Sequence, residues 1–205
     1  MTSTIAYLGP PGTYSEQALN RYDAGAQGLP VRSVRAAILA VVSGEAPLAV
    51  VPIENSLEGA VTATLDALAG ESHPVTIIAE VVLPVTHCLI GPEQPLEDIR
   101  TVISHPQPLG QCAGYLERHL PDATQVAVAS TAEAVRTVAA EGGDRAAIGS
   151  RAAAELYGMP VLAEAIEDAP GNLTRFVVLG PSFGPAGYEA VDVSTEEPWA
   201  SMRAR

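Results

Sequence analysis

The sequence predicts an α/β fold with two lobes, and three features lead to this prediction. Short β-rich runs alternate with helical patterns along most of the chain, which is typical of α/β proteins. Two stretches, Val75–Ile90 and 161–179, are suited to cross from one lobe to the other and back. With 205 residues and 47% hydrophobic content, the chain is large enough to fill two small cores.

The first half of the chain is expected to contain strands and helices in alternation. The expected elements are a strand at Ile5–Leu8, a helix from about Ser15, a helix at Val34–Val42 and a strand at Leu48–Ile53. A second amphipathic helix is expected at Leu57–Leu68, because its apolar residues recur on one face. These residues are Leu57, Val61, Leu65 and Leu68.

The apolar stretch Val75–Ile90 is too long for one ordinary strand, so we expect two strands joined by a bend near Pro84. A second α/β set follows it. Its expected strands are Thr101–Ile103, Gln125–Ala129 and Ala146–Ile148, then Val161–Ile166 and Thr174–Leu179, and its expected helices are Leu109–His119, Ala132–Ala140 and Ala152–Tyr157. The predicted first lobe is 1–80 plus 168–182 and the second is 81–167. Residues 183–205, rich in Pro, Gly and acidic residues, are expected to form a tail.

Composition excludes several classes of function. A net charge of −13 argues against nucleic-acid binding, which needs a basic surface. All 11 basic residues are Arg, so a Schiff-base lysine, covalent pyridoxal phosphate and a Walker-type phosphate loop are excluded. Four scattered His and no close Cys pair make a transition-metal site unexpected. We therefore expect chemistry that uses side chains alone, with no cofactor and no metal.

The two cysteines and the start of the chain favour a cytoplasmic protein. Cys88 and Cys112 lie far apart in apolar or helical contexts, as expected of buried free thiols in a reducing compartment. The first residues lack the basic start of a secretory signal, and no apolar run is long enough to span a membrane.

Four polar clusters share one arrangement, in which an apolar strand ends in polar residues and a helix follows. The clusters are Gly9-Pro-Pro-Gly-Thr-Tyr-Ser15, Pro52-Ile-Glu-Asn-Ser56, Ser104-His-Pro-Gln107 and Ser130-Thr131. Backbone N–H groups and helix N-termini at such strand ends can hold a carboxylate even on an acidic protein. This arrangement favours an anionic small-molecule ligand.

A structural explanation competes with the functional one at each cluster. All four fit a capping box, in which a side chain caps the helix that follows: Thr13-x-x-Glu16, Asn55-x-x-Glu58, Ser104-x-x-Gln107 and Ser130-x-x-Glu133. Glu54 directly follows an apolar strand and is not needed as a cap, so a desolvated carboxyl with a raised pKa is plausible there. His87 and His105 can be hydrogen-bonded core or turn residues, or proton shuttles.

The cluster Thr174-Arg175-Phe176 falls where the return crossing is expected. A strand explains Thr174 and Phe176, and a surface position explains Arg175. From the residues alone, the argument ends at a two-lobed, anion-binding α/β protein whose substrate stays open.

Taken together, the clusters resemble the four signature motifs of the prephenate dehydratase family, in the family's order and approximate spacing. The matching segments are Gly9–Ser15, Pro52–Ser56, Ser104–Gln107 and Asn172-Leu-Thr-Arg-Phe176, and the stretch Ala147–Tyr157 is similar to the family's segment before the last motif. The resemblance covers about residues 4–180. It implies a type II periplasmic-binding-protein-like fold with the active site in the cleft between the lobes.

The resemblance also implies a reaction and a set of site residues. The reaction is the conversion of prephenate to phenylpyruvate with loss of CO2 and water, without a cofactor. Thr174 matches the threonine regarded as essential in the family. The expected catalytic residues are Thr174 and Glu54, and the expected substrate-binding residues are Thr13, Asn55, Ser56, Ser104, Gln107, Arg175 and Phe176.

A hypothesis for the chemistry follows from the limits of a hydroxyl group. A Thr hydroxyl is too weak an acid to protonate the leaving group unaided. We therefore expect Thr174 to hold the leaving hydroxyl while Glu54, protonated because it is buried, supplies the proton. Arg175 or helix N-termini would hold a carboxylate, and Asn55 and Gln107 would orient the substrate.

Other functions stay open at this point. Family members usually continue into an ACT domain that binds phenylalanine, and nothing similar follows Gly180, so we expect no phenylalanine inhibition of the usual type. The same fold could serve an arogenate dehydratase, a non-aromatising prephenate decarboxylase of a specialised pathway, or a non-catalytic small-anion binder. A homodimer is the default expectation for an enzyme of this size.

Overall fold

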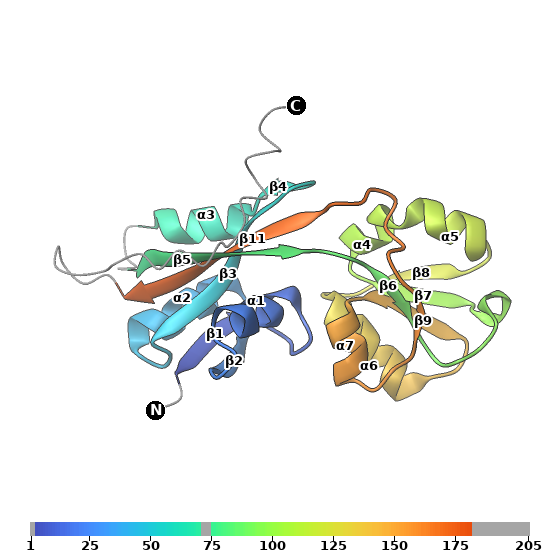
Figure 1. Ribbon diagram of the computed structural model, residues 1–205, viewed down its shortest axis with the longest axis horizontal. Coiled ribbons are helices and arrows are strands. Elements are labelled where there is room, and N and C mark those ends of the chain that lie inside the picture. The colour runs from blue at the N-terminus through green and yellow to red at the C-terminus, as the bar shows by residue number, and fades with distance from the viewer. Residues whose placement is uncertain (1–2, 71–74, 182–205) are drawn as a thin grey trace. The chain divides into compact units, whose positions relative to one another are not determined.

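The computed structural model describes residues 3–70 and 75–181, which form two compact α/β units (Figure 1). Of these described residues, the first unit contains those up to Leu8, those within Ala18–Leu83 and those from Leu173 on. The second contains Gly9–Gln17 and Pro84–Asn172. Two α/β units confirm the predicted fold class. The predicted tail, 183–205, lies outside the described residues.

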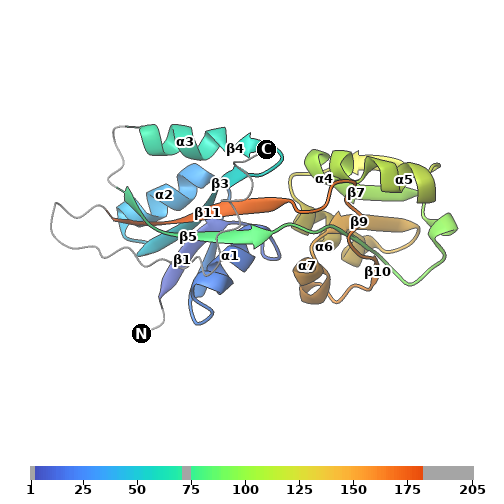
Figure 2. The same cartoon turned by 45° about the horizontal axis from the view of Figure 1, so that its top comes forward.

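The first unit is built on a mixed sheet. Its strands lie in the order β2 (Gln27–Val31), β1 (Thr4–Leu8), β3 (Leu48–Asn55), β11 (Leu173–Pro181) and β5 (Val75–Pro84), with β4 (Gly59–Ala60) paired to β3. β1 runs parallel to β2 and to β3, whereas β11 runs antiparallel to β3. Figure 2 shows β5 and β11 side by side at one edge of this sheet.

Two helices of the first unit, α2 (Val34–Ser43) and α3 (Thr62–Ala69), pack with the sheet in a common core. The core joins Ile38 and Val41 of α2 to Val51 of β3 and Val177 of β11. Ser33 caps α2 by accepting the N–H of Ala36, and Gly44 ends it with φ of 76°. The remaining helix, α1 (Tyr14–Tyr22), starts in residues assigned to the second unit and ends in the first.

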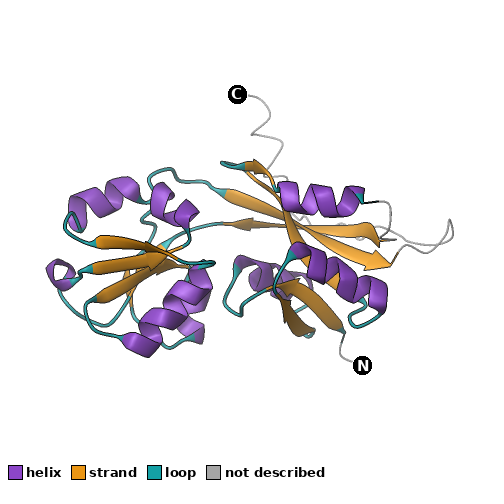
Figure 3. Cartoon of the chain, turned by 180° about the vertical axis from the view of Figure 1, so that it is seen from behind, coloured by secondary structure: helices purple, strands orange, loops and turns teal. Residues whose placement is uncertain are grey.

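The second unit has a five-stranded sheet with helices on both faces (Figure 3). Its strands lie in the order β10 (Val161–Ala163), β6 (Cys88–Ile90), β9 (Arg145–Gly149), β7 (Thr101–Ser104) and β8 (Thr124–Ala127). One core contains side chains of α4 (Pro106–Gln111) and α5 (Ala113–His119), and another contains side chains of α6 (Thr131–Glu141) and α7 (Arg151–Leu156). A short 3₁₀ helix, Leu96–Asp98, precedes β7. This three-layer arrangement explains why the central strands are apolar on both faces.

The predicted helix at Leu57–Leu68 is wrong in its first half. Residues 56–58 form a turn, β4 follows, and α3 begins only at Thr62. The Asn55 side-chain oxygen accepts the N–H groups of Leu57 and Glu58, so it directs the chain into a turn instead of a helix. The predicted apolar face is not the buried one, because Leu57 and Leu65 are 49% and 44% exposed.

Other boundaries also differ from the predictions. The expected helix at Leu109–His119 is two helices that meet at Cys112, where φ is −112° and ψ is 13°. β2 was not expected; it is an edge strand that contains Gly28 and Pro30 and has no apolar run. The predicted bend near Pro84 is confirmed, because β5 ends at Pro84 and β6 begins at Cys88.

The assignment of residues 9–17 to the second unit differs from the predicted bounds of the first lobe. Contacts of this segment account for it. Ser150 donates to the Gly12 carbonyl, Tyr157 donates to the Pro11 carbonyl, and Tyr14 donates to the Thr86 carbonyl. A side chain at Gly12, whose φ is 89°, would stand 3.3 Å from the Cβ of Ala153. Glycine is therefore needed there both for the turn and for the close approach to α7.

The buried hydroxyl of Thr64 predicts a local contribution to stability. Thr64 is the fully buried residue of α3, and its hydroxyl donates to the Pro52 carbonyl in β3. Thr64→Val keeps the shape but leaves that carbonyl without its donor, so the free energy of unfolding should fall by about 1–3 kcal/mol. Urea unfolding of the purified variant measures the change.

Thr62→Val is the matched control, because Thr62 is exposed in the first turn of the same helix. It should change the free energy of unfolding by less than about 0.5 kcal/mol. Equal effects of the two substitutions would contradict a specific role for the Thr64 hydroxyl.

Candidate active site

The polar end of β3 and the polar start of β11 lie beside each other because the two strands are antiparallel. Thr174 pairs with Asn55, and Arg175 pairs with Glu54. Directly opposed residues of an antiparallel pair lie on the same face of the sheet, so each pair of side chains is in contact range. The pairing thus brings together two of the four predicted motifs, Pro52–Ser56 and Asn172–Phe176.

An irregularity in this ladder separates its polar end from its apolar core. The register shifts between Arg175 and Phe176, and Phe176 pairs with Pro52 rather than Ile53. β3 therefore carries one extra residue at this point, as in a β-bulge. Beyond the bulge the paired residues are apolar, as in Val177 with Val51. Bulges often redirect side chains next to functional sites.

Asn55 holds Thr174 directly. The Asn55 Nδ2 donates to the Thr174 Oγ1 at 2.8 Å, while the Asn55 Oδ1 accepts from the N–H groups of Leu57 at 3.0 Å and Glu58 at 3.1 Å. The Asn55 side chain is in a residue that is only 8% exposed, so water competes little for its amide group. The turn after β3 therefore fixes the side chain that in turn fixes Thr174.

Ser56 fixes the backbone at the start of β11. Its N–H donates to the Leu173 carbonyl at 2.8 Å, and its Oγ accepts the Leu173 N–H at 2.8 Å. These two hydrogen bonds fix the backbone of Leu173, the residue directly before Thr174. Ser56 thus supports the position of Thr174 through the backbone.

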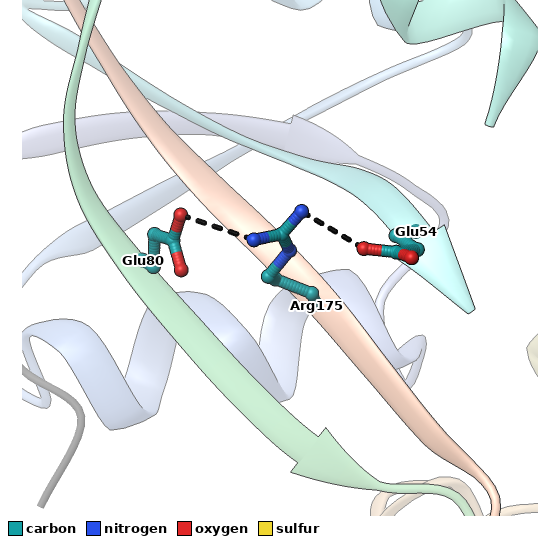
Figure 4. A network of polar contacts seen from close by, with 3 residues as sticks. All are labelled: Glu54, Glu80 and Arg175. Atoms are coloured by element: carbon teal, nitrogen blue, oxygen red, sulfur yellow. Dashed lines mark hydrogen bonds and ion pairs between the residues drawn. The ribbon is translucent and has the colours of Figure 1, made fainter. Parts of the chain in front are cut away.

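Arg175 lies between two carboxylates on neighbouring strands (Figure 4). Its Nη2 is 2.8 Å from the Glu54 Oε2, and its Nη1 is 3.4 Å from the Glu80 Oε1. Glu80 lies on β5 and was not among the predicted site residues. The signal for it in the sequence is an acidic residue in an otherwise apolar strand, Val75–Pro84.

The expectation that Glu54 is a buried carboxyl is wrong. Its side chain is 38% exposed and accepts a charge-assisted hydrogen bond from Arg175. Glu54 is the residue before the last of β3, and its backbone pairs with Arg175 on one side and Ala60 on the other. A proton held on Glu54 by burial therefore has no structural support.

Phe176 is part of the core rather than a surface residue. It is 2% exposed and is among the largest fully buried side chains. Its role in the structure is to anchor the strand that carries Thr174 and Arg175. Direct contact of Phe176 with a substrate, as expected from its motif, is not supported by this burial.

Ser104 and Gln107, the two predicted site residues around the start of α4, have different side-chain environments. Ser104 is fully buried, and its hydroxyl donates to the Ile148 carbonyl in the neighbouring β9 at 2.8 Å. The cap of α4 is His105, whose Nδ1 accepts the Gln107 N–H at 3.3 Å, so the predicted cap by Ser104 is wrong. Pro106 at the first helical position moves the helix start beyond Ser104. The Gln107 side chain is half-buried and makes no side-chain hydrogen bond within residues 3–70 and 75–181.

Thr13 caps α1, as the capping explanation predicts. Its Oγ1 accepts the Glu16 N–H at 3.4 Å, and the Glu16 carboxylate accepts the Gly12 N–H at 2.6 Å. Ser130 caps α6 in the same way, with the Glu133 N–H donating to its Oγ at 3.1 Å. These side chains satisfy the open N–H groups of helix starts.

Buried titratable groups of the second unit are poor candidates for nucleophiles or proton shuttles. Cys88 and Cys112 are free and buried, as predicted, and burial raises the pKa of Cys112 to about 12. Burial also raises the pKa of Cys88 and of Tyr14. His87 is 2% exposed, and its Nε2 is 2.9 Å from the Gln111 Oε1.

No group of three or more His, Cys, Asp or Glu among the described residues could hold a metal ion. In the same part of the chain, no helix has the length and apolarity that crossing a membrane requires.

Comparison with known proteins identifies the family of this chain. The family model described as "Prephenate dehydratase" matches residues 5–182. The chain belongs to the prephenate dehydratase family. Membership agrees with the four motifs in the sequence.

Individual members show how far the similarity extends. A "Bifunctional chorismate mutase/prephenate dehydratase" of Neisseria gonorrhoeae is 41% identical over 95% of this chain and 54% of that protein. "Arogenate dehydratase 5, chloroplastic" of Arabidopsis thaliana is 41% identical over 87% of this chain and 42% of that protein. The chain therefore spans about half the length of these relatives.

A solved structure of a family member has a similar fold. The prephenate dehydratase of Arthrobacter aurescens, solved in complex with L-Phe, is 37% identical with a TM-score of 0.82. The match covers 91% of this chain and 62% of that one. The two-unit α/β fold is thus the fold of prephenate dehydratases.

The buried His87 predicts a pH dependence of stability. Burial lowers the pKa of His87 below its ordinary value of 6.5, against the opposing effects of the Gln111 hydrogen bond and the Glu167 charge. Below pH 6.5 the unfolded chain binds a proton that the folded chain still excludes, so stability is lost as the pH falls. We expect His87→Gln to reduce the fall in the free energy of unfolding between pH 7 and pH 5, measured by urea unfolding.

His119→Gln is the control, because it removes an exposed imidazole from the same unit. A fall of the same size in His87→Gln and the wild type would show that His87 does not contribute to the acid sensitivity.

Proposed function

We propose that this chain catalyses the conversion of prephenate to phenylpyruvate, the reaction after which its family is named. The observation that carries the proposal is the position of Thr174 at the end of the β3–β11 ladder, held by Asn55 and adjacent to Arg175. A hydroxyl held by an amide suits a reaction in which a hydroxyl leaves, and helix N-termini can bind the carboxylates. The match to the motif with the essential threonine supports the same reading.

The chemistry needs few participants. Prephenate carries a carboxylate on one ring carbon and a hydroxyl on the opposite one. When the bond to the carboxylate breaks, CO2 leaves and its electron pair enters the ring. The C–O bond then releases its electron pair to oxygen, one proton turns the leaving hydroxide into water, and the ring becomes aromatic. The reaction is redox-neutral, and aromatisation provides the driving force, so we propose that no cofactor takes part.

Thr174 would act on the leaving hydroxyl. As the C–O bond breaks, the oxygen gains negative charge and becomes a stronger hydrogen-bond acceptor. A hydroxyl donor aimed at it therefore stabilises the transition state more than the ground state, which is the condition for catalysis. Thr174 need not be an acid of matched pKa for this, because the hydrogen bond itself supplies the stabilisation.

The proton would come from solvent rather than from Glu54. The half-exposed Glu54 carboxylate already accepts from Arg175, and Glu80 accepts from the other side of the same guanidinium. We propose that these two carboxylates hold Arg175, whose side chain projects from the face of β11 opposite to Thr174, and that helix N-termini hold a substrate carboxylate. Asn55 would position Thr174, and Gln107 is the candidate of the second unit for a contact with substrate.

The hydroxyl of Thr174 can be tested by two substitutions. Thr174→Ser keeps a hydroxyl and should retain kcat within about tenfold of the wild type, whereas Thr174→Val keeps the shape and should lose about 10²–10³-fold in kcat. Turnover is followed by the alkaline absorbance of phenylpyruvate enolate. A reaction without enzyme at the same pH is the control, because prephenate aromatises spontaneously in acid. Loss of turnover in Thr174→Ser with retained turnover in Thr174→Val would show that the methyl group or packing matters rather than the hydroxyl.

The roles of Glu54 and Glu80 can be tested separately. A general acid is typically worth about 10²–10⁴-fold in rate, so a proton-donating Glu54 would lose that much on Glu54→Gln. We expect a loss of kcat below about tenfold and a pH–rate profile of wild-type form. Glu80→Gln, at the other end of the Arg175 network, should have a similarly small effect. A loss of 10²-fold or more confined to Glu54→Gln would restore Glu54 as the proton donor.

The substrate is decided by direct comparison. Arogenate differs from prephenate in an amine that replaces the keto group, and the arogenate dehydratase of Arabidopsis thaliana is as similar in sequence as the bacterial relative. We propose prephenate as the preferred substrate, to be tested by kcat/KM for both compounds. Prephenate consumption without phenylpyruvate would indicate a non-aromatising decarboxylase, and binding without turnover would indicate a small-anion binder.

We also propose that the enzyme is cytoplasmic and homodimeric. The buried free thiols of Cys88 and Cys112 suit a reducing compartment, and a two-fold dimer is the common state of soluble enzymes. Sedimentation equilibrium of the purified chain measures its mass in solution.

A further inference from the structure

The Asn55 side chain has only one arrangement that satisfies its neighbours. Two backbone N–H groups, from Leu57 and Glu58, point at one end of its amide. Donors require an acceptor, so this end is the oxygen, and the NH2 group is at the other end. The group facing Thr174 is therefore the Asn55 NH2, 2.8 Å from the Oγ1.

This arrangement determines the direction of the hydrogen bond to Thr174. An amide NH2 donates and does not accept in hydrogen bonds of this kind, so the Thr174 oxygen is the acceptor. A hydroxyl has a single proton, and that proton is directed away from Asn55. Thr174 makes no other side-chain hydrogen bond within residues 3–70 and 75–181. Its proton is therefore available to a ligand.

The surroundings hold this direction in place before any ligand arrives. Asn55 is 8% exposed and is held by the turn that its own oxygen closes. Ser56, directly after β3, and Leu173, at the start of β11, exchange two hydrogen bonds. These hold the register that brings Thr174 to Asn55. Reversal of the amide would cost two hydrogen bonds to backbone N–H groups, so the donor direction is preorganised.

We propose that Asn55 is a positioning residue that fixes the Thr174 hydroxyl as a hydrogen-bond donor to the leaving hydroxyl of the substrate. This inference rests on the proposed dehydratase function and deepens it. It replaces the predicted direct contact of Asn55 with the substrate by an action through Thr174. Without Asn55, the Thr174 hydroxyl could turn its proton toward another acceptor and offer the substrate a lone pair instead.

Asn55→Asp reverses the direction with almost no change in shape. A carboxylate has acceptors at both ends, so it keeps the hydrogen bonds to Leu57 and Glu58 but now accepts the Thr174 proton. We expect kcat for prephenate to fall about 10²–10³-fold, the range for loss of one preorganised donor. The new charge also repels an anionic substrate, so a rise in KM is expected in addition.

Two comparisons separate direction from charge. Leu57→Asp places a new carboxylate two residues further on at a 49% exposed position and leaves the Asn55–Thr174 hydrogen bond intact. It should keep kcat within about threefold of the wild type and raise KM only. Combined with Thr174→Val, Asn55→Asp should lower kcat no further, because no hydroxyl is left to orient. Far-UV circular dichroism and urea unfolding establish that each variant is folded.

The outcomes distinguish this inference from the function on which it rests. Absence of wild-type turnover of prephenate overturns the proposed function and this inference with it. In an active enzyme, Asn55→Asp with kcat within threefold of the wild type overturns the inference alone. So does a double variant whose loss in kcat is the product of the two single losses, since that result indicates that Asn55 acts independently of Thr174.

Discussion

The antiparallel pairing of β3 with β11 brings together parts of the chain that lie 119 residues apart, at Asn55 and Thr174. Most features of the candidate site depend on this pairing. The apolar residues beyond the bulge pack into the core of the first unit and hold the two strands together. Phe176 anchors the point at which the ladder changes from apolar to polar. The polar residues are thus held by burial of the apolar residues behind them.

The polar end of the ladder combines two kinds of interaction with different physical roles. The Asn55–Thr174 hydrogen bond joins neutral groups and has a defined direction, so it orients a proton. The network of Glu54, Arg175 and Glu80 joins charges, and its partly exposed side chains are screened by water. It orients a cation rather than a proton. Thr174 and Arg175 are consecutive in β11, so the oriented donor lies on one face of the sheet and the oriented positive charge on the other.

In the second unit, most polar residues at the ends of strands form hydrogen bonds with the backbone of a following helix or a neighbouring strand. Thr13 and Ser130 cap helices, and the Ser104 hydroxyl pairs with a neighbouring strand. Buried N–H and C=O groups must find partners, so a short polar residue after an apolar strand often satisfies the backbone. The same residue types at the end of β3 serve this purpose too, because Asn55 closes a turn while it holds Thr174. One side chain thus meets a structural and a proposed functional requirement.

The sequence by itself determined the α/β class, most strands and the four motifs, because these depend on local periodicity and on residues close together in the chain. It also indicated buried Cys88 and Cys112, since apolar neighbours predict burial. Only the tertiary structure decided how the motif residues divide between site, cap and core. The burial of Ser104 and Phe176, the exposure of Glu54 and the part played by Glu80 depend on which strands are neighbours and on the bulge in β3. Strand order and register arise from packing between residues distant in the chain, and short-range patterns carry no information about such packing.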